Sequence, residues 1–333
     1  MNFWLFRSNL RHLEYYHQIE DLETFKQKCH DFYMLFPIWM LENNLCDEAT
    51  IWRLHDYPVD EIVFNVNGKP YHQRFVKSFN EIFKYRSPDV SFFRGGFLEY
   101  DEITNMSPEF FGLKLYLGAS KRVTPQYGGV YDKILVESDE QLSIPNSIPF
   151  YKTANPNIFK PLKYIHDKHY DLCWICNFKQ IRHKGQEFFI SEVAKSRYLK
   201  FLNIIHIGDD SEVGIDMCKK YGVTNISFLG SLDRSDINVS LNLSKFGIVT
   251  SNQVDGCPRV STEVLCSGTP LLIRKDTNLL DYYKYNYPVL TFDDGNIETI
   301  VKNNLENYNV RYRNKKININ FDDICKKNFD LWR

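Results

Sequence analysis

The sequence predicts an α/β protein built from two doubly wound domains, and three observations lead to that prediction. The chain has 333 residues, more than a single hydrophobic core usually organises, so two domains are expected. From about residue 171 onward, apolar runs of strand length alternate with segments of helical spacing. Continuous apolar strands separated by helices are typical of a parallel sheet covered on both faces. The first half alternates less regularly, so we expect an abbreviated version of the same architecture there.

The second half gives the clearest pattern of elements. Strands are expected at 171–176, 202–208, 225–230, 246–251, 269–274 and 287–292. Helices are expected at 184–200, 211–222, 234–245, 258–268, 277–285 and 296–308. Within the helix at 211–222, Ser211 is the expected N-cap and Gly222 the C-terminal stop. A binding site is expected at the carboxyl ends of such strands, where helix N-termini point.

The first half is assigned less completely. Strands are expected at 49–54, 61–66, 90–96, 113–119 and 132–139, and helices at 21–41 and 73–85. The segment 143–161 contains four prolines and no helical period, which marks a connection between domains. We therefore assign 1–145 to the first domain and 146–305 to the second. Residues 306–333 form a tail that we interpret as a helix returning to the first domain.

Composition restricts the partners and the compartment. Lys and Arg together number 41 against 42 Asp and Glu, so the formal charge of −1 argues against nucleic acid as the main partner. No apolar run approaches the roughly 20 residues that span a bilayer. The N-terminus lacks the pattern of a signal peptide, so we expect a cytoplasmic protein whose cysteines are reduced. Peripheral association with the cytoplasmic membrane face is left open.

Several common signatures are absent from the sequence. No G-x-G-x-x-G follows a strand, and there is no P-loop, no H-E-x-x-H and no D-x-D that would hold a metal-bound diphosphate. Cys173 and Cys176 form a C-x-x-C, but they lie in a strand-like run where residues three apart point to opposite faces. We therefore expect no metal and no resident cofactor.

A basic turn follows the first strand of the second domain. The segment 177–185 places Lys179, Arg182 and Lys184 between a strand and a helix. A helix N-terminus with Lys and Arg side chains is suited to a phosphate or diphosphate. A solvated basic turn explains the same residues, and slightly better when the segment is taken alone.

A second segment, 254–268, also leads from a strand into a helix. Gly256 permits close backbone approach, and Pro258 suits the first helical turn. Asp255 and Glu263 are carboxylates that could accept hydrogen bonds from sugar hydroxyls. Alternatively, Asp255 caps the helix and Glu263 faces solvent, although the small apolar neighbours of Glu263 indicate a semi-buried carboxylate that needs a partner. Elsewhere, Gly230 at a strand end could lie against a flat base, but turns use glycine constantly.

Taken in order, these segments resemble the group 1 glycosyltransferases of the GT-B fold, of the retaining family 4 type. The resemblance extends from about Pro145 to Tyr283. It rests on Phe159-Lys160-Pro161, Lys179 through Lys184-Gly185, Phe228-Leu229-Gly230, Ser251, the Asp255-to-Glu263 spacing and Gly268-Thr269-Pro270. The sequence departs from the family pattern at Lys179, where arginine is usual, and at Asp255, where glutamate is usual.

The resemblance implies two Rossmann-like domains facing a cleft, a nucleotide-diphosphate sugar as donor and no metal. It implies catalytic roles for Asp255, Lys184 and Lys179. Its donor-binding positions would be Arg182, Gly230, Gly256, Cys257, Pro258, Arg259, Val260, Ser261, Thr262 and Glu263. On the acceptor side, the first domain offers Gly95, Gly96 and Ser120 as candidates, with ordinary loops as the favoured explanation.

The function that the resemblance implies is transfer of a sugar, with retention, from a nucleotide-diphosphate sugar to a saccharide or glycoconjugate acceptor. A sugar-nucleotide epimerase of the same fold is one alternative, although the Asp255-to-Glu263 pattern argues against it. A non-catalytic GT-B binding or scaffold protein is the other. Turnover of any nucleotide sugar would exclude the latter.

Overall fold

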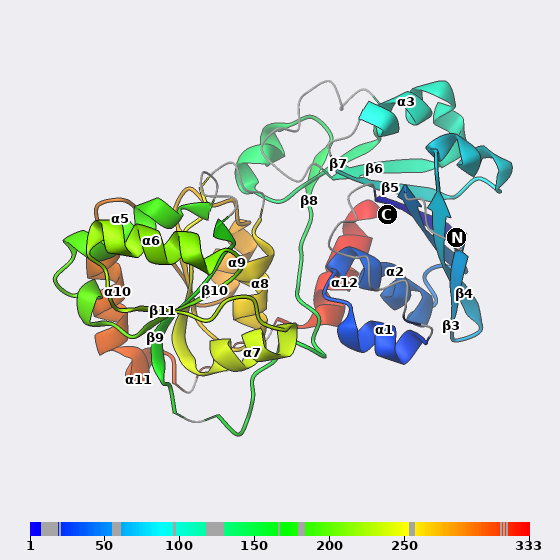
Figure 1. Cartoon of the computed structure of the whole chain (residues 1–333). Coiled ribbons are helices and arrows are strands. Elements are labelled where there is room, and N and C mark those ends of the chain that lie inside the picture. Colours follow the sequence, from blue (N-terminus) through cyan, green and yellow to red (C-terminus); the bar gives the residue numbers. More distant parts are fainter. Residues whose placement is uncertain are drawn as a thin grey trace. The chain divides into compact units, whose positions relative to one another are not determined.

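The chain forms two compact units in a computed structural model (Figure 1). Unit 1 comprises Met1–Tyr151 with Asp322–Arg333, and unit 2 comprises Lys152–Phe321. The division at Tyr151 falls inside the proline-rich connection 143–161. The structure describes residues 1–7, 19, 21–54, 61–95, 98–117, 130–165, 167–178, 184–252, 257–313, 315, 317 and 319–333.

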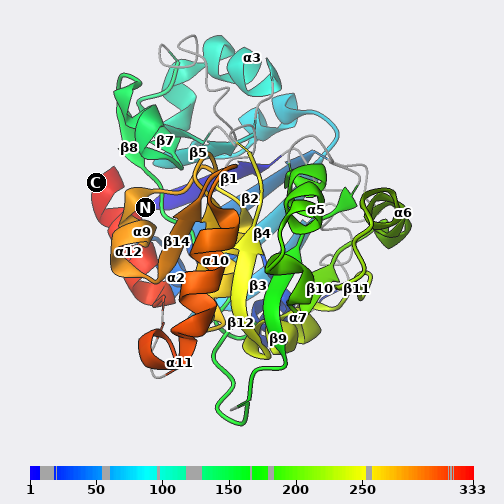
Figure 2. The ribbon, with the colours of Figure 1, turned by 90° about the vertical axis from the view of Figure 1, so that its left-hand side faces the viewer.

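Unit 2 contains a six-stranded parallel sheet in the order β11-β10-β9-β12-β13-β14. Its strands are β9 (Tyr170–Ile175), β10 (Ile204–Ile207), β11 (Ile226–Phe228), β12 (Ser244–Val249), β13 (Leu271–Arg274) and β14 (Val289–Phe292). The chain runs from β9 outward to β11, then returns to β12 and runs outward the other way. Figure 2 shows β9 and β12 side by side at the middle of this sheet. All six strands match the sequence prediction in type and position.

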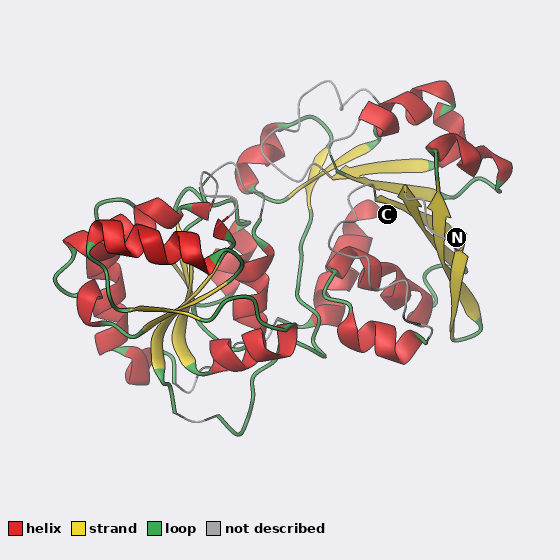
Figure 3. Ribbon diagram, viewed as in Figure 1, coloured by secondary structure: helices red, strands yellow, loops and turns green. Residues whose placement is uncertain are grey.

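The helices of unit 2 cover both faces of its sheet (Figure 3). They are α5 (Gln186–Lys195), α6 (Ser211–Tyr221), α7 (Arg234–Asn242), α8 (Arg259–Cys266), α9 (Asp281–Asn286), α10 (Ile297–Glu306) and α11 (Tyr308–Arg311). α8 packs closely on β12, since a Cβ at Gly247 would lie 2.5 Å from Cγ2 of Val264. Two details differ from the predictions. The N-cap of α6 is Asp210, with Ser211 as the first helical residue, and α5 ends at Lys195 because Ser196 is extended.

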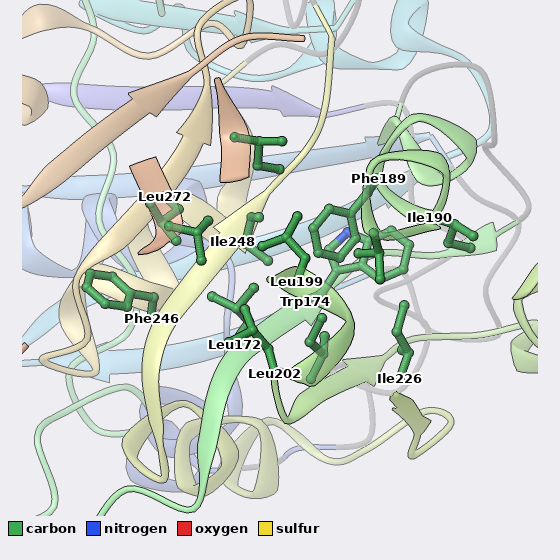
Figure 4. Packing of buried hydrophobic residues seen from close by; sticks show 14 of the residues in the cluster. Leu172, Trp174, Phe189, Ile190, Leu199, Leu202, Ile226, Phe246, Ile248 and Leu272 are labelled. Atoms are coloured by element: carbon green, nitrogen blue, oxygen red, sulfur yellow. The ribbon is translucent and has the colours of Figure 1, made fainter. Parts of the chain in front are cut away.

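The core of unit 2 is apolar on both sides of the central strands. Figure 4 shows Trp174 of β9 among the aliphatic side chains of neighbouring strands and the Phe189 ring of α5. The Trp174 and Phe189 rings meet edge to face with centroids 4.8 Å apart. Burial of these side chains is the main favourable contribution to folding and explains why apolar runs alone predicted the sheet.

Unit 1 contains an eight-stranded sheet in the order β3-β4-β2-β1-β5-β6-β7-β8, parallel except for the β3–β4 pair. Its strands are β1 (Asn2–Arg7), β2 (Glu48–Leu54), β3 (Glu61–Val66), β4 (Lys69–Val76), β5 (Val90–Arg94), β6 (Leu113–Leu117), β7 (Lys133–Val136) and β8 (Ser147–Pro149). Described connections include the short 3-10 helices 79–84 and 139–143. The sheet of unit 1 is therefore full, and the connections β4–β5 and β7–β8 each carry a 3-10 helix.

The predicted helix at 73–85 is wrong. Residues up to Val76 form β4, where burial alternates between the two faces, and Phe79–Lys84 form a 3-10 helix capped by Ser78 and Glu81. Apolar residues at the end of a strand and at the start of the next turn gave a false helical spacing. The strand β1 was not predicted, because its six residues are a short apolar run with no turn signal before it.

The predicted helix at 21–41 is two helices, α1 (Leu22–Lys28) and α2 (Phe32–Glu42). Asp31 begins α2 by accepting a hydrogen bond from the Tyr33 backbone N–H. Unit 1 also contains α3 (Leu98–Met106) and α12 (Phe321–Trp332), except that Phe321 belongs to unit 2. Trp332 of α12 stacks on Phe3 of β1 with ring centroids 6.1 Å apart. No helix in the described ranges is long and apolar enough to cross a membrane.

Candidate functional site

The strand order of unit 2 places a topological switch point at the carboxyl ends of β9 and β12. These two strands are neighbours, yet the chain leaves them toward opposite edges of the sheet. In open α/β sheets, ligands bind at such a switch point, because the two departing loops leave room between them. The loop after β9 and the loop after β12 carry most of the residues that the sequence analysis singled out.

Lys184 and Gly185 lie directly over the end of β12. The Thr250 hydroxyl donates a hydrogen bond of 2.6 Å to the Lys184 carbonyl and accepts one of 3.1 Å from Trp174 Nε1. Gly185 has φ +67°, and a Cβ there would overlap the Thr250 carbonyl. Only glycine therefore fits where the α5 N-terminus approaches β12. The hydrogen bond from Thr250 therefore holds the Lys184 backbone at the switch point of the sheet.

The loops after β9, β10 and β11 are tied together by Asp209. Its carboxylate accepts hydrogen bonds from Asn177 Nδ2 at 3.0 Å and from the Ser231 hydroxyl. The Gly208 N–H donates to the Gly230 carbonyl at 2.9 Å. Gly230, with φ +71°, has open space where a Cβ would lie. Gly230 therefore lies at the carboxyl edge of the sheet, just after β11 and two strands from β9. Because it has no side chain, a ligand could approach its backbone closely.

The N-terminal turn of α8 lies after β12, with Pro258 as its N-cap. Arg259 is exposed, while Ser261 and Thr262 are buried. The Thr262 hydroxyl donates back to the Arg259 carbonyl at 2.9 Å, so it is used within the helix. The buried Ser261 hydroxyl has no hydrogen-bond partner among the described residues.

Glu263 is 1 % exposed, so its carboxylate needs compensation. Arg234 at the start of α7 donates a hydrogen bond of 3.2 Å to Oε1, and Nε of Arg259 lies 3.8 Å from the same oxygen. The other oxygen, Oε2, is buried and has no hydrogen-bond partner in the described part of the chain. The expectation of a buried, partnered carboxylate is therefore correct, but Arg234 was missed because it is 29 positions away in sequence.

A buried lysine also supports the loop before α8, and no sequence pattern indicated it. Lys152, 9 % exposed, donates from Nζ to the Cys257 carbonyl at 2.7 Å. Its backbone is held in turn by Tyr283, whose hydroxyl accepts from the Lys152 N–H at 2.7 Å and donates to its carbonyl. The backbone just before α8 is therefore fixed by a charge-assisted hydrogen bond.

The crossover into unit 2 packs against the end of α8. Gly268, with φ +79°, would place a Cβ 2.9 Å from Pro161. The buried Asn238 and Asn242 of α7 accept hydrogen bonds from the backbone N–H groups of Lys160 and Leu162. The Phe159–Pro161 and Gly268–Pro270 motifs are thus two sides of one packing contact.

His206 lies in the carboxyl half of β10, the strand next to β9. Burial lowers its pKa to about 4, and its Nε2 lies 2.9 Å from the Cys176 carbonyl. Burial also raises the pKa of the Cys176 thiol. Both groups are therefore uncharged at neutral pH, so neither reduces the positive charge that Lys184 brings to this edge of the sheet.

Several predicted site residues lie outside the described residues: Lys179, Arg182, Asp255, Gly256, Gly96 and Ser120. Gly95 follows β5 in unit 1, where its carbonyl accepts from the Tyr116 hydroxyl at 2.5 Å. Val260 is half-buried in the first turn of α8. No group of three or more metal-binding side chains occurs within the described ranges, and independence from metals stays a prediction.

Comparison with solved structures identifies the fold. No protein-family model and no curated protein matches this sequence. Sucrose-phosphate synthase from Thermosynechococcus elongatus superposes with a TM-score of 0.68 at 11% identity, covering 100% of this chain and 98% of that one. A structure from E. coli named for trehalose-6-phosphate and bound with UDP-2-fluoro glucose gives 0.62 at 8% identity, with coverages of 100% and 95%. HepE of Anabaena, in complex with UDP and glucose, gives 0.61 at 11% identity, with coverages of 99% and 96%.

These likenesses extend over both units and over nearly the whole of each relative. They show that the chain has the GT-B fold of two α/β units, which confirms the predicted fold class. At such identities the likeness concerns the fold, and the chemistry has to be argued from the site.

Proposed function

We propose that this protein is a glycosyltransferase that moves a sugar from a nucleoside diphosphate sugar to a saccharide or glycoconjugate acceptor. The observation that carries the proposal is the position of Lys184-Gly185 over β12, at the switch point of the sheet. A cationic side chain at this point, beside the start of α5, is suited to the diphosphate of the donor. Because relatives of this fold are bound to UDP or UDP-2-fluoro glucose, a uridine nucleotide is the first donor to test.

In the proposed reaction, the bond between the anomeric carbon and the diphosphate breaks and a bond to an acceptor hydroxyl forms, with release of the hydroxyl proton. The leaving diphosphate gains negative charge, and Lys184 would stabilise that charge as it develops. We assign the same role to Lys179, with Arg182 beside it, and we place Asp255 near the transferred sugar. This set of cations would take the part that a divalent metal plays in other transferases.

Glu263 is proposed to accept hydrogen bonds from the ribose hydroxyls. A buried carboxylate oxygen without a partner is costly, and such an atom is retained where it serves a ligand. Gly230 would lie near the base, and the backbone from Gly256 to Arg259, with the first turn of α8, would line the sugar and phosphates. Retention of configuration and a saccharide acceptor are part of the proposal, as is a cytoplasmic location with optional attachment to the membrane face.

The test begins with thermal unfolding of the full chain with UDP, GDP, ADP, CMP or dTDP, each with and without EDTA. A nucleotide at 100 times its dissociation constant stabilises by roughly 2.7 kcal/mol, which raises Tm by about 5–10 °C for units of this size. We expect one nucleotide to produce this shift and EDTA to leave it unchanged. The matching nucleotide sugar should then be consumed, with release of the nucleoside diphosphate.

Two variants make the test specific to the proposed site. Lys184→Ala should abolish the shift, whereas Lys195→Ala, at the exposed far end of the same helix, should keep it. No shift with any nucleotide from a folded sample would overturn the proposal. A shift without any turnover of the nucleotide sugar would instead favour a non-catalytic binding protein, and an epimerised nucleotide sugar would favour an epimerase.

A further inference from the structure

Three arginines form a row across neighbouring parallel strands of unit 1. Arg7 is the last residue of β1, and it pairs in register with Arg53 of β2 on one side and with Arg94, the last residue of β5, on the other. Adjacent strands lie about 4.8 Å apart, so the three side chains start close together at the carboxyl edge of the sheet. This edge is where open α/β sheets bind ligands.

All three arginines extend from the same face of the sheet, toward the N-terminal turn of α2. Arg7 forms a buried ion pair with Asp31, and its guanidinium carbon lies 5.8 Å from the centre of the Tyr33 ring. Arg94 lies over the same ring at 4.1 Å. Arg53, 1 % exposed, donates to the Met34 sulfur at 3.3 Å. Residues 31–34 of α2 therefore contact every member of the row.

Two of the described carboxylates lie near the row, and the first of them offsets the charge of Arg7. The Asp31 carboxylate pairs with Arg7 and caps α2, where it accepts from the Tyr33 N–H at 3.0 Å. Glu137, 4 % exposed after β7, accepts a hydrogen bond of 2.9 Å from the Tyr33 hydroxyl.

Arg94 differs from the other two arginines, because it is only half-buried. Its guanidinium has no carboxylate partner among the described residues, and its buried Nε has no acceptor there. It therefore presents planar donors at the strand ends, beside the Arg7–Asp31 pair and Arg53.

We propose that this arginine row binds an anionic group, a phosphate or a carboxylate, carried by the acceptor. That the anion belongs to an acceptor rests on the function proposed above, while the anion site itself rests on the positions of the three arginines. Arg94 has no carboxylate partner among the described residues, so an anion at the strand ends would supply its counter-charge. The arginine fork also matches the two oxygens of a phosphate or carboxylate better than a lysine would. In this site Arg94 is the contact residue, while Arg7 is paired with Asp31 and Arg53 contacts the Met34 sulfur.

The first experiment is an NMR titration of the 15N-labelled full chain with inorganic phosphate at low ionic strength. It follows the Nε–Hε signals of the arginine side chains. The Arg94 signal is assigned by its loss in Arg94→Gln. Glucose 6-phosphate, glucuronate and glucose are then titrated in the same way. We expect the Arg94 signal to move with phosphate and with at least one of the two charged sugars. Affinity for that sugar should exceed that for glucose by about tenfold or more.

Three variants distinguish specific binding at Arg94 from attraction by general surface charge. Arg94→Gln should weaken binding of the charged sugar by about tenfold or more, and Arg94→Lys should restore part of it. Arg86→Gln, which removes an exposed arginine of the same unit, should bind like the wild type. The proposal is overturned if glucose binds as tightly as both charged sugars, if the Arg94 signal does not move, or if Arg86→Gln and Arg94→Gln lose the same affinity.

The outcome is independent of the donor test. UDP should raise Tm equally in the wild type, Arg94→Gln and Arg86→Gln, because these changes lie in unit 1. If phosphate binds at Arg94 but no nucleotide binds, the anion site stands and the transferase proposal fails. If nucleotide binds and neither phosphate nor a charged sugar binds, the transferase proposal stands and the acceptor class proposed here is wrong. A preference for glucose 6-phosphate or for glucuronate decides between phosphate and carboxylate.

Discussion

The carboxyl edges of the two sheets are built in different ways. In unit 2 the three central strands β9, β10 and β12 end in the apolar residues Ile175, Ile207 and Val249, and polar groups come from the loops and helix N-termini beyond them. Farther along this sheet, β13 ends in a charged residue, Arg274, which is paired with Asp294. In unit 1 the charge lies on the strands themselves, at Arg7, Arg53 and Arg94. The carboxyl edge of unit 2 therefore offers backbone groups above apolar strand ends, and the carboxyl edge of unit 1 offers charged side chains that belong to the strands.

This difference fits two kinds of ligand. A diphosphate can be held by backbone N–H groups, a helix dipole and one or two cations, which only need a close approach such as that of Gly185 to Thr250. A terminal anion on a small acceptor presents few atoms, so a planar donor such as Arg94 has to reach it directly.

The largest effect is expected from the ion pair beneath the arginine row. Asp31→Ala removes the buried partner of Arg7 and the N-cap of α2 together. Breaking a buried pair leaves an uncompensated charge, so we expect unit 1 to lose about 3–5 kcal/mol of unfolding free energy in urea. Asp47→Ala, which removes an exposed ion pair with the N-terminus, is the control and should leave the urea midpoint unchanged. Equal urea midpoints for Asp31→Ala and Asp47→Ala would mean that Arg7 does not need the Asp31 carboxylate for the stability of unit 1.

The second effect concerns the charge held at the edge of unit 2. Lys184→Ala should lower kcat for transfer or hydrolysis of the nucleotide sugar by about 10²–10³-fold, the usual loss when one stabilising group is removed from a developing charge. Product release measured by chromatography gives the rate. Lys195→Ala, on the same helix, should stay within about twofold of the wild type, since surface ion pairs contribute little. A comparable loss in both variants would assign the effect to the charge of α5 as a whole.

The third prediction concerns the pH dependence of stability that the buried, uncharged His206 of β10 causes. Burial holds the His206 pKa at about 4 in the folded protein, against 6.5 when exposed. Below pH 6.5 the unfolded chain binds a proton that the folded chain does not, so stability should fall as the pH drops toward 4. The loss should be on the order of 2–3 kcal/mol.

Urea unfolding at a series of pH values measures this loss. His206→Gln should flatten the profile between those limits, whereas His169→Gln, at an exposed position of unit 2, should not. An unchanged profile in His206→Gln would show that other groups cause the acid sensitivity.

The smallest effect is expected at Ser261. Its buried hydroxyl has no partner among the described residues, so Ser261→Ala should change the unfolding free energy by no more than about 0.5 kcal/mol. Thr250→Val is the contrasting variant, because its hydroxyl bonds both Trp174 Nε1 and the Lys184 carbonyl, and it should cost about 1–3 kcal/mol. Urea midpoints decide the comparison. A larger loss in Ser261→Ala than in Thr250→Val would contradict this description of the edge.

Much of unit 2 could be predicted from its sequence. The predicted strands 171–176 and 246–251 contain the apolar runs 172–176 and 246–249, because both faces of these strands are buried, and that pattern needs no knowledge of neighbours. The sequence also singled out Lys184 and a semi-buried Glu263, since each lies just after a strand or in the first turns of the following helix, and their roles at a donor site stay predictions. Arg234 and Lys152 were not, because they meet their partners only after the sheet has formed.

Unit 1 was predicted less completely. Its first strand is a run of six residues that lies between β2 and β5, segments that occur much later in the chain. β4 carries polar residues on alternate positions and runs directly into a 3-10 helix, which imitates a helical period. Local patterns lose their meaning where strands are short and the turn signals are weak.

The sequence by itself determined the alternation of strands and helices, the parallel sheet of unit 2 and the polar loops at its carboxyl edge. These properties depend on local periodicity and on the geometry of a strand that leads into a helix. Only the tertiary structure decided the arginine row, because Arg7, Arg53 and Arg94 become neighbours through the register of β1 with β2 and β5. Register is a property of paired strands, and it brings together residues that no local pattern relates.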